Sequence, residues 1–392
     1  QLALSNPAPR QGTALSIGLT VDAMDADGNV IIGPGIYDNG PIALTNTDKS
    51  GGTSLSTLNL GDPSATVKLA YNGRPIPGGS ATFSASAAGV PASAVKSATL
   101  TPTAPQRNWA TAGPMAAARG LLAAGSINGV LYAVGGSDNG VNVLNTLATY
   151  DPSAALWSAK APMPTARYGL ATGVINGVLY AVGGCGASGF LSTVEAYDPA
   201  TNGWSAKAPM PTARCYLAAG VLNGILYAVG GFNHSGYLKT VEAYNPSTNA
   251  WTTKAAMPTA RYAPAAGVVN GLLYAIGGVK DSGSSFVALA TVDGYDPSTN
   301  TWVAKAPMPA PSYFLAAATL SGTLYAMGGI NNSGALSSVN GYDPTTNAWS
   351  AKPSLSVARL ALAAGVVGSA IYAVGGYDNN NVPLAINESF TP

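Results

Sequence analysis

Five arginines recur at one position of a repeated segment, and their chemistry suits the binding of an acidic ligand. A guanidinium group matches a carboxylate through two parallel hydrogen bonds, so several arginines around one opening could hold such a ligand. The other interpretation is structural: each arginine bonds loop carbonyls of a neighbouring copy. A further copy has Ser312 in this place. The five candidates are Arg119, Arg167, Arg214, Arg261 and Arg359.

Aromatic residues lie beside these arginines and in loops that differ between the copies. Aromatic rings can stack on a sugar ring while neighbouring Asn and Asp side chains bond its hydroxyls, or they can receive a peptide. The same loops, rich in Gly, Asn and Ser, are also ordinary turns. We therefore predict a protein or a glycan as the partner at this face. The aromatic candidates are Tyr168, Tyr262, Tyr313, Phe232 and Tyr377.

Few residues are suited to catalysis. The chain has one histidine, His234, which excludes histidine-rich zinc sites and iron sites with two histidines. No nucleophile elbow or carboxylate stands out beside it for a Ser-His-Asp assembly. We therefore predict no cofactor, no metal and no catalytic residue. Acidic residues in one repeated register are expected to pair at the surface with lysines across a hairpin; these are Glu195, Glu242 and Asp293 with Lys207, Lys254 and Lys305.

Two cysteines, Cys185 and Cys215, have no counterpart in the other copies of the repeat. They fall near the same face of adjacent copies. In an exported protein they could form a disulfide between those copies, and the alternative is two separate small buried thiols. We predict the disulfide.

Gly-Gly pairs and tryptophans define a repeated unit. The fold of this unit must position the arginines, the aromatic residues and the cysteines described above. The Gly-Gly pairs and the tryptophans recur at the same intervals, including one interval that is longer than the others. This agreement indicates that residues from about 106 to 392 are six copies of one unit. The common intervals are 48, 47, 47, 51 and 47 residues. The pairs begin at Gly135, Gly183, Gly230, Gly277, Gly328 and Gly375, and the tryptophans are Trp109, Trp157, Trp204, Trp251, Trp302 and Trp349.

Each copy predicts four antiparallel strands. In the second copy, an apolar run of small residues at 170–175 is followed by Asn176-Gly177 and a second apolar run at 178–182. An Asn-Gly pair between two apolar runs is a strong hairpin signal. A third strand at 193–197, a turn, and a strand from Trp204 complete the unit. Such a meander cannot bury both faces alone, so the copies are expected to stack around an axis.

This unit resembles the kelch repeat, whose marks are Gly-Gly after the second strand and a Tyr and a Trp at fixed offsets beyond it. The resemblance covers nearly three quarters of the chain and implies a six-bladed β-propeller over residues 109–392. The repeated Tyr and Trp residues are then expected to pack between blades, and the arginines to ring one mouth of the central channel. Because the last copy stops at Pro392 without a fourth strand, the segment around Trp109 is expected to complete the sixth blade.

The resemblance implies more than one class of function, because the fold alone does not decide it. In kelch proteins that bind acidic peptides, the matching arginines contact the ligand. The same ring occurs in galactose oxidase, but its copper site needs histidines that this chain lacks. Some six-bladed kelch enzymes isomerise sialic acid, which requires little beyond an arginine for the carboxylate and an acid–base pair. The arginine ring is compatible with that activity.

Residues 1–102 lack the repeat and predict an immunoglobulin-like β-sandwich. Short alternating segments are separated by turn sequences such as Asp27-Gly28-Asn29 and Asn72-Gly73, the pattern of an antiparallel sandwich. This region looks like a bacterial immunoglobulin-like domain. Residues 103–108 are expected to form a short, extended linker. The predicted fold class is therefore all-β throughout.

Composition and charge narrow the partners. Charged residues make up 9% of the 392 residues, and 18 Lys and Arg nearly balance 17 Asp and Glu. This balance excludes nucleic acid as the main partner, because phosphate binding depends on clustered positive charge. No apolar stretch is long enough to predict a transmembrane segment. The start at Gln1, without a basic and apolar leader, fits a processed protein, so an extracellular or cell-surface location is expected.

Together these features predict an exported, non-enzymatic recognition or structural assembly protein, at a cell surface, in a matrix or in a filament. Its propeller is expected to present a loop face to a protein or a glycan, with a homo-oligomer or filament as a possible assembly. The alternative is a carbohydrate-active enzyme of the sialic-acid-epimerase type, which would act on an anionic sugar at the arginine-lined mouth.

Overall fold

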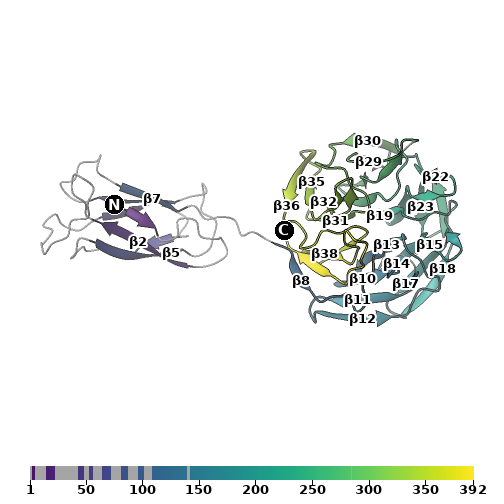
Figure 1. The fold of residues 1–392 in the computed structure, drawn as a ribbon, viewed down its shortest axis with the longest axis horizontal. Coiled ribbons are helices and arrows are strands. Elements are labelled where there is room, and N and C mark those ends of the chain that lie inside the picture. Colours follow the sequence, from purple (N-terminus) through teal and green to yellow (C-terminus); the bar gives the residue numbers. More distant parts are fainter. Residues whose placement is uncertain are drawn as a thin grey trace, which may run out of the picture. The chain divides into compact units, whose positions relative to one another are not determined.

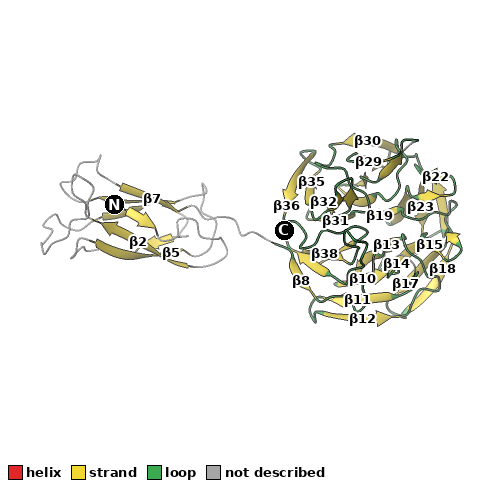
Figure 2. Ribbon diagram, in the orientation of Figure 1, coloured by secondary structure: helices red, strands yellow, loops and turns green. Residues whose placement is uncertain are grey.

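The computed structural model divides the chain into two compact units, Gln1–Gln106 and Arg107–Pro392. Every regular element in the described residues is a β-strand (Figure 2), so the all-β prediction is confirmed for them. The described residues are 2–4, 15–22, 43–47, 53–55, 64–71, 81–86, 96–100, 108–138, 142–283 and 285–392.

The described strands of the first unit form two antiparallel sheets. One sheet has the order β1-β2-β5-β4 and the other has the order β3-β6-β7. Phe83 on β6 is buried. The immunoglobulin-like topology and the linker at 103–108 fall largely outside the described residues and stay predictions. The strands are β1 (Leu2–Leu4), β2 (Leu15–Asp22), β3 (Ala43–Asn46), β4 (Thr53–Leu55), β5 (Ser64–Tyr71), β6 (Ala81–Ser86) and β7 (Lys96–Leu100).

The second unit is a ring of six four-stranded antiparallel sheets, here called blades 1 to 6 (Figure 1). The first strands of adjacent blades contact one another, so they surround the axis. Blade 1 consists of β9 (Ala123–Ile127), β10 (Val130–Val134), β11 (Leu147–Asp151) and β12 (Leu156–Lys160). Blade 2 consists of β13 (Ala171–Ile175), β14 (Val178–Val182), β17 (Val194–Asp198) and β18 (Gly203–Lys207). Blade 3 consists of β19 (Ala218–Leu222), β20 (Ile225–Val229), β23 (Val241–Asn245) and β24 (Ala250–Thr253).

The remaining blades repeat this order. Blade 4 consists of β25 (Ala265–Val269), β26 (Leu272–Ile276), β29 (Val292–Asp296) and β30 (Thr301–Lys305). Blade 5 consists of β31 (Ala316–Leu320), β32 (Thr323–Met327), β35 (Val339–Asp343) and β36 (Ala348–Lys352). Blade 6 consists of β37 (Ala363–Val367), β38 (Ala370–Val374), β39 (Asn387–Phe390) and β8 (Ala110–Ala112).

The loops after the second strands of blades 2 to 5 contain short hairpins of their own. The sequence predicts only polar loops at these places. The hairpins are β15 (Cys185–Gly186) with β16 (Gly189–Phe190), β21 (Phe232–Asn233) with β22 (Gly236–Tyr237), β27 (Val279–Asp281) with β28 (Phe286–Ala288), and β33 (Ile330–Asn331) with β34 (Gly334–Ala335).

The ring closes where the sequence predicts. Strand β8, which precedes blade 1 in the chain, is the fourth strand of blade 6 and pairs with β39 through Asn387 opposite Ala112. Trp109 stacks on Phe390 with ring centroids 5.4 Å apart. The prediction of six blades joined across the two ends of the repeat region is confirmed.

Tyrosine and tryptophan side chains pack between adjacent blades, as expected. The ring centroid of Tyr180 in blade 2 lies 5.8 Å from that of Tyr244 in blade 3. In blade 3, Tyr244 packs on Trp251 with ring centroids 5.2 Å apart. The Trp251 indole donates a hydrogen bond of 2.8 Å to the carbonyl of Ala208, which precedes the blade. Asn249 Oδ1 accepts from the Ala208 N–H at 2.9 Å and from the Tyr244 hydroxyl at 2.7 Å. The N–H and the carbonyl of Ala208 are therefore both hydrogen-bonded to side chains of blade 3.

Glycine is required where two blades approach most closely. Gly183 and Gly184 have φ angles of +60° and +104°, which favour glycine. The Gly184 N–H donates to the Arg214 carbonyl at 3.0 Å, and a Cβ on Gly183 would lie 2.8 Å from the same oxygen. The Gly-Gly pairs therefore let each blade contact the segment that leads into the next one.

Candidate functional site

The five arginines lie inside the blades, not at the channel mouth. All five are buried, and four form ion pairs with an acidic residue on the third strand of the same blade. Arg214 lies 3.0 Å from Glu242. The expected position at the mouth is therefore wrong, because each side chain turns back into its blade, where a carboxylate offsets its charge. The other pairs are Arg167 with Glu195, Arg261 with Asp293, and Arg359 with Glu388 at 3.3 Å.

These arginines also bind backbone carbonyls, but within their own blade and not in a neighbouring one. Arg167 Nη1 donates to the carbonyls of Gly183 at 3.1 Å and Thr193 at 2.9 Å. Burial lowers the pKa of Arg167, and the nearby Glu195 carboxylate opposes this shift. A ligand at the surface would not touch such a side chain.

The expected surface pairs between acidic residues and lysines are also wrong. Glu195 is buried against Arg167, while Lys207 lies opposite Val194 in the strand register. Successive side chains of a strand point to opposite faces, so the lysine and the glutamate face different sides of the sheet.

A closed ring of six backbone hydrogen bonds surrounds the axis at this end of the channel. The Tyr216 N–H donates to the Gly169 carbonyl at 2.7 Å, and the Ala263 N–H donates to the Tyr216 carbonyl at 3.0 Å. Each residue occupies the same place in its copy, and all six have φ between +50° and +57°. We call them the central ring: Leu121, Gly169, Tyr216, Ala263, Phe314 and Ala361.

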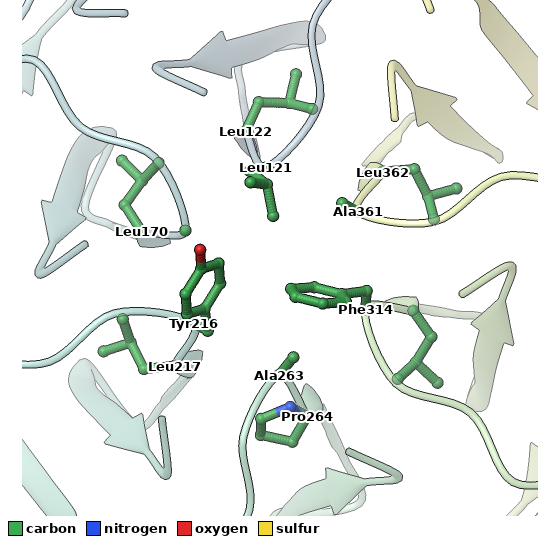
Figure 3. A pocket seen from close by; sticks show the side chains of 12 residues that line it. Leu121, Leu122, Leu170, Tyr216, Leu217, Ala263, Pro264, Phe314, Ala361 and Leu362 are labelled. Carbon is green, nitrogen blue, oxygen red and sulfur yellow. The ribbon is translucent and has the colours of Figure 1, made fainter. Parts of the chain in front are cut away.

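Two aromatic side chains of the central ring lie at the channel mouth (Figure 3). Tyr216 and Phe314 lie beside the axis on either side of Ala263, with ring centroids 5.5 Å apart and planes at 78°. They line a depression of about 100 Å³ together with Leu121 and other apolar side chains. The mouth of the channel is therefore apolar.

The same two side chains form one wall of a larger pocket above blades 3 to 5. Its volume is about 400 Å³. The segments that lead into blades 3, 4 and 5 supply four of its residues, and the hairpins of blades 3 and 4 supply the other four. We call it the aromatic pocket; its residues are Tyr216, Phe232, Tyr237, Tyr262, Val279, Phe286, Tyr313 and Phe314.

Tyr262 is the centre of the aromatic pocket. Its ring centroid lies 4.8 Å from that of Tyr216 and 5.3 Å from that of Phe314, with interplanar angles of 57° and 81°. Phe232 meets it edge-on at 5.8 Å and Tyr237 stacks on it at 5.6 Å. Mostly edge-to-face contacts hold the rings at steep angles to one another. The pocket is therefore a cage and not one flat platform.

Three phenols of the aromatic pocket stay protonated at neutral pH. Burial is the main cause that raises the pKa of Tyr216, of Tyr262 and of Tyr313. These hydroxyls can donate hydrogen bonds to a ligand but do not exchange protons readily near neutral pH. Because no lining side chain is an acid or a base of the Asp, Glu, Lys, Arg or His type, the pocket favours an uncharged ligand.

A disulfide adjoins the aromatic pocket. Cys185 and Cys215 are bonded, with Cα atoms 5.2 Å apart. Cys215 directly precedes Tyr216 and exchanges two backbone hydrogen bonds with Phe232, at 3.1 and 2.9 Å. The disulfide thus ties β15 of blade 2 to the segment that carries Tyr216 and bonds Phe232.

The structure brings together some of the predicted aromatic residues. Tyr262, Tyr313 and Phe232 line the aromatic pocket, and the ring of Tyr168 lies 5.9 Å from that of Tyr216. Tyr377 lies elsewhere: it is buried, and its hydroxyl donates to the Ser137 carbonyl of blade 1 at 3.0 Å.

Five of the eight pocket residues are not among the aromatic candidates named from the sequence: Tyr216, Tyr237, Val279, Phe286 and Phe314. Tyr216 and Phe314 share one place in their copies, two residues beyond the arginine or Ser312, where the other four copies have Leu, Gly or Ala. That difference between copies is the signal that could have identified them.

The described residues contain neither a candidate metal site nor a candidate membrane-spanning helix. Among them, no group of three or more His, Cys, Asp and Glu side chains could hold a metal ion. In the same part of the chain, no helix has the length and hydrophobicity needed to cross a membrane.

Comparisons with known proteins agree with this architecture. A family model described as the KLHDC2/KLHL20/DRC7 Kelch-repeats domain matches residues 98–278, and the Kelch motif matches residues 260–309 and 311–356. No curated protein matches the chain significantly. Among solved structures, 461 chains match.

One of these solved structures is described by the words "Structure of YjhT". It aligns with a TM-score of 0.60 and 18% sequence identity, and covers 72% of this chain and 96% of that chain. At this identity the likeness concerns the fold alone. The family matches and the ring of six four-stranded sheets lead to one conclusion: the chain carries kelch repeats, and these fold as a six-bladed β-propeller.

Proposed function

We propose that this protein is a non-enzymatic recognition protein that binds an uncharged segment of another protein in its aromatic pocket. The observation that carries the proposal is the grouping of seven aromatic rings from three blades around one hollow of about 400 Å³. Aromatic-lined pockets with phenol hydroxyls receive proline-rich and other extended segments, which already have low conformational entropy.

The shape of the pocket favours a peptide over a sugar. A sugar ring stacks on an open, flat aromatic face, whereas the rings around Tyr262 meet mostly at angles of 57° to 88°. A cage of this kind suits a compact apolar side chain such as proline, with phenol hydroxyls bonding the peptide carbonyls.

The enzyme alternative depends on an arginine that reaches an anionic substrate. The five repeat arginines are buried, so this observation gives that alternative no support. We also propose that the protein is exported, because the disulfide between blades 2 and 3 is typical of oxidising compartments.

The exposed residue Phe286 gives a test that does not disturb folding. Phe286 lines the pocket and is 59% exposed, while Leu156 on blade 1 is 60% exposed and lies outside the pocket. An array of immobilised uncharged, proline-rich peptides and an array of neutral glycans are probed with the whole protein. We expect selected peptides to bind, Phe286→Ser to lower their affinity about tenfold, and Leu156→Ser to leave it unchanged.

Two results would refute this function. One is equal peptide binding by the protein and by Phe286→Ser. The other is binding of glycans, but no peptides, at the aromatic pocket. Tyr262→Phe should retain most of the affinity that Tyr262→Ala loses, because the ring contributes more contact than the hydroxyl.

A further inference from the structure

The positive charge of Arg119 lacks a carboxylate partner among the described residues. Arg119 is 4% exposed and is absent from the ion pairs that hold the other four repeat arginines. Its guanidinium donates to Thr146 Oγ1 and to the Ala133 carbonyl at 3.4 Å, while Nε has no partner. Blade 1 therefore buries a cation with neutral acceptors only.

The other blades show which groups are missing. In blade 2 the Glu195 carboxylate accepts hydrogen bonds from Arg167 and, at 2.7 Å, from the Thr165 hydroxyl. Blade 1 has the same strand register, but Ala148 stands where blade 2 has the glutamate and Ala117 stands where it has the threonine. The Glu195 carboxylate and the Thr165 hydroxyl therefore both lack a counterpart in blade 1.

The place of the missing carboxylate lies nearer to solvent in blade 1 than in blade 2. Ala148 is partly exposed, whereas Glu195 is buried. Both alanines are shorter than the residues that occupy these places in blade 2.

Blade 5 shows the electrically neutral alternative. There, Ser312 replaces the arginine and Asn340 replaces the acid, so both charges are absent together. Blade 1 keeps the arginine, Arg119, but has no acidic residue in the place of Glu195. Its arginine stays charged at neutral pH, because burial lowers the pKa of Arg119 only to about 10. An uncompensated buried charge is unfavourable, so a counter-ion from solution would stabilise blade 1.

We propose that Arg119 binds a small monovalent anion at the position that a glutamate carboxylate occupies in blades 2, 3 and 6. Formate has the same two oxygens as that carboxylate, and chloride has the same charge. The anion is a structural ligand of blade 1 and is separate from the aromatic pocket.

Thermal unfolding in the presence of formate tests this site. All six tryptophans lie between residues 109 and 349, so tryptophan fluorescence follows the propeller and not the first unit. Ionic strength is held constant with gluconate, an anion much larger than formate, and chloride is tested in the same way. We expect the unfolding midpoint to rise by about 2 °C or more as formate replaces gluconate.

Two variants at position 148 distinguish the effect of a negative charge from the effect of a filled volume. Ala148→Glu supplies the missing carboxylate, so its midpoint in gluconate should exceed that of the unmodified protein and should no longer respond to formate. Ala148→Gln fills the space without charge and should also lose the response, without the rise in gluconate. Asn340→Glu in blade 5, where no arginine is present, is the matched control and should not raise the midpoint.

The inference would be overturned by the same formate response in Ala148→Glu as in the unmodified protein, or by no response in the latter. Should Ala148→Glu fail to fold, crystals of the unmodified protein soaked in bromide decide the question. An anomalous peak beside the Arg119 guanidinium supports the site, and no peak there refutes it.

Discussion

The guanidinium group of Arg214 and the carboxylate of Glu242 lie 3.0 Å apart, and both side chains are buried in blade 3. Such a pair joins the segment that leads into a blade to the third strand of that blade. Three other blades repeat this link with the same residue types or with aspartate in place of glutamate. The buried ion pair is therefore a feature of the repeat. Its loss should lower the free energy of unfolding.

Removing one partner should destabilise the propeller strongly. Glu242→Gln leaves Arg214 charged and unpaired, so we expect the free energy of unfolding to fall by about 3–5 kcal/mol. The double variant Arg214→Met with Glu242→Leu should cost less, because no charge remains buried. Urea unfolding followed by tryptophan fluorescence measures both; losses that simply add in the double variant would contradict the role of the pair. Lys239→Met, at an exposed lysine of the same blade, is the control.

Gly220 on the inner strand of blade 3 should not tolerate alanine. A Cβ there would lie 2.5 Å from Leu273 Cδ1 of blade 4, so we expect Gly220→Ala to cost about 1–3 kcal/mol through overpacking. Blade 5 has Ala318 in this place, and its neighbour in blade 6 is Ile371. Adding Leu273→Ile to Gly220→Ala should therefore recover part of the lost thermal stability. No recovery would mean that the clash lies elsewhere.

Loss of the disulfide should weaken both stability and ligand binding. The bond closes a loop with a sequence separation of 30 residues, for which chain entropy predicts a contribution of about 3–4 kcal/mol. Reduction, or Cys185→Ser with Cys215→Ser, should lower the unfolding midpoint. It should also lower peptide affinity, because Cys215 holds Phe232 and precedes Tyr216. Alkylation of the native protein followed by mass spectrometry checks the bond first, and two modified cysteines would show that it is not there.

Stability should decline in alkaline solution through buried tyrosines. Burial raises the pKa of Tyr274 and of Tyr295 to about 12, whereas tyrosine in an unfolded chain titrates near pH 10. The folded state therefore holds these protons more tightly, so their contribution to stability is complete below about pH 10 and is lost as the pH rises through about 12. Near-ultraviolet absorbance reports tyrosine ionisation, and tryptophan fluorescence reports unfolding. Tyr274→Phe should reduce the decline, and an unchanged decline would argue against this residue as a cause.

The period of the sequence was sufficient to predict the six blades, the closing strand and the packing of Tyr and Trp between blades. Each of these follows from counting copies and from where the last copy ends. The ion pairs could not be predicted in this way, because Arg167 and Glu195 are 28 residues apart and their contact depends on how the incoming segment folds over the blade. The strand pattern alone instead suggested lysine as the partner of Glu195.

The aromatic pocket was predicted in part for a similar reason. Tyr262 and Tyr313 directly follow the repeated arginine or serine, so they were easy to find. Tyr216 and Phe314 have positive φ angles, which large aromatic residues rarely adopt, and nothing local in the sequence predicts that backbone. Phe286 lies on β28, whose hairpin replaces an expected irregular loop.

The hydrogen bonds of the central ring involve backbone atoms alone, and residues as different as glycine, leucine and phenylalanine already occupy its six places. The central ring thus accepts side chains of different size, although its positive φ angles favour glycine. Mutation can vary the surface around the axis while the joints between blades remain the same, so a gene encoding this propeller can acquire a new specificity without first evolving a new scaffold.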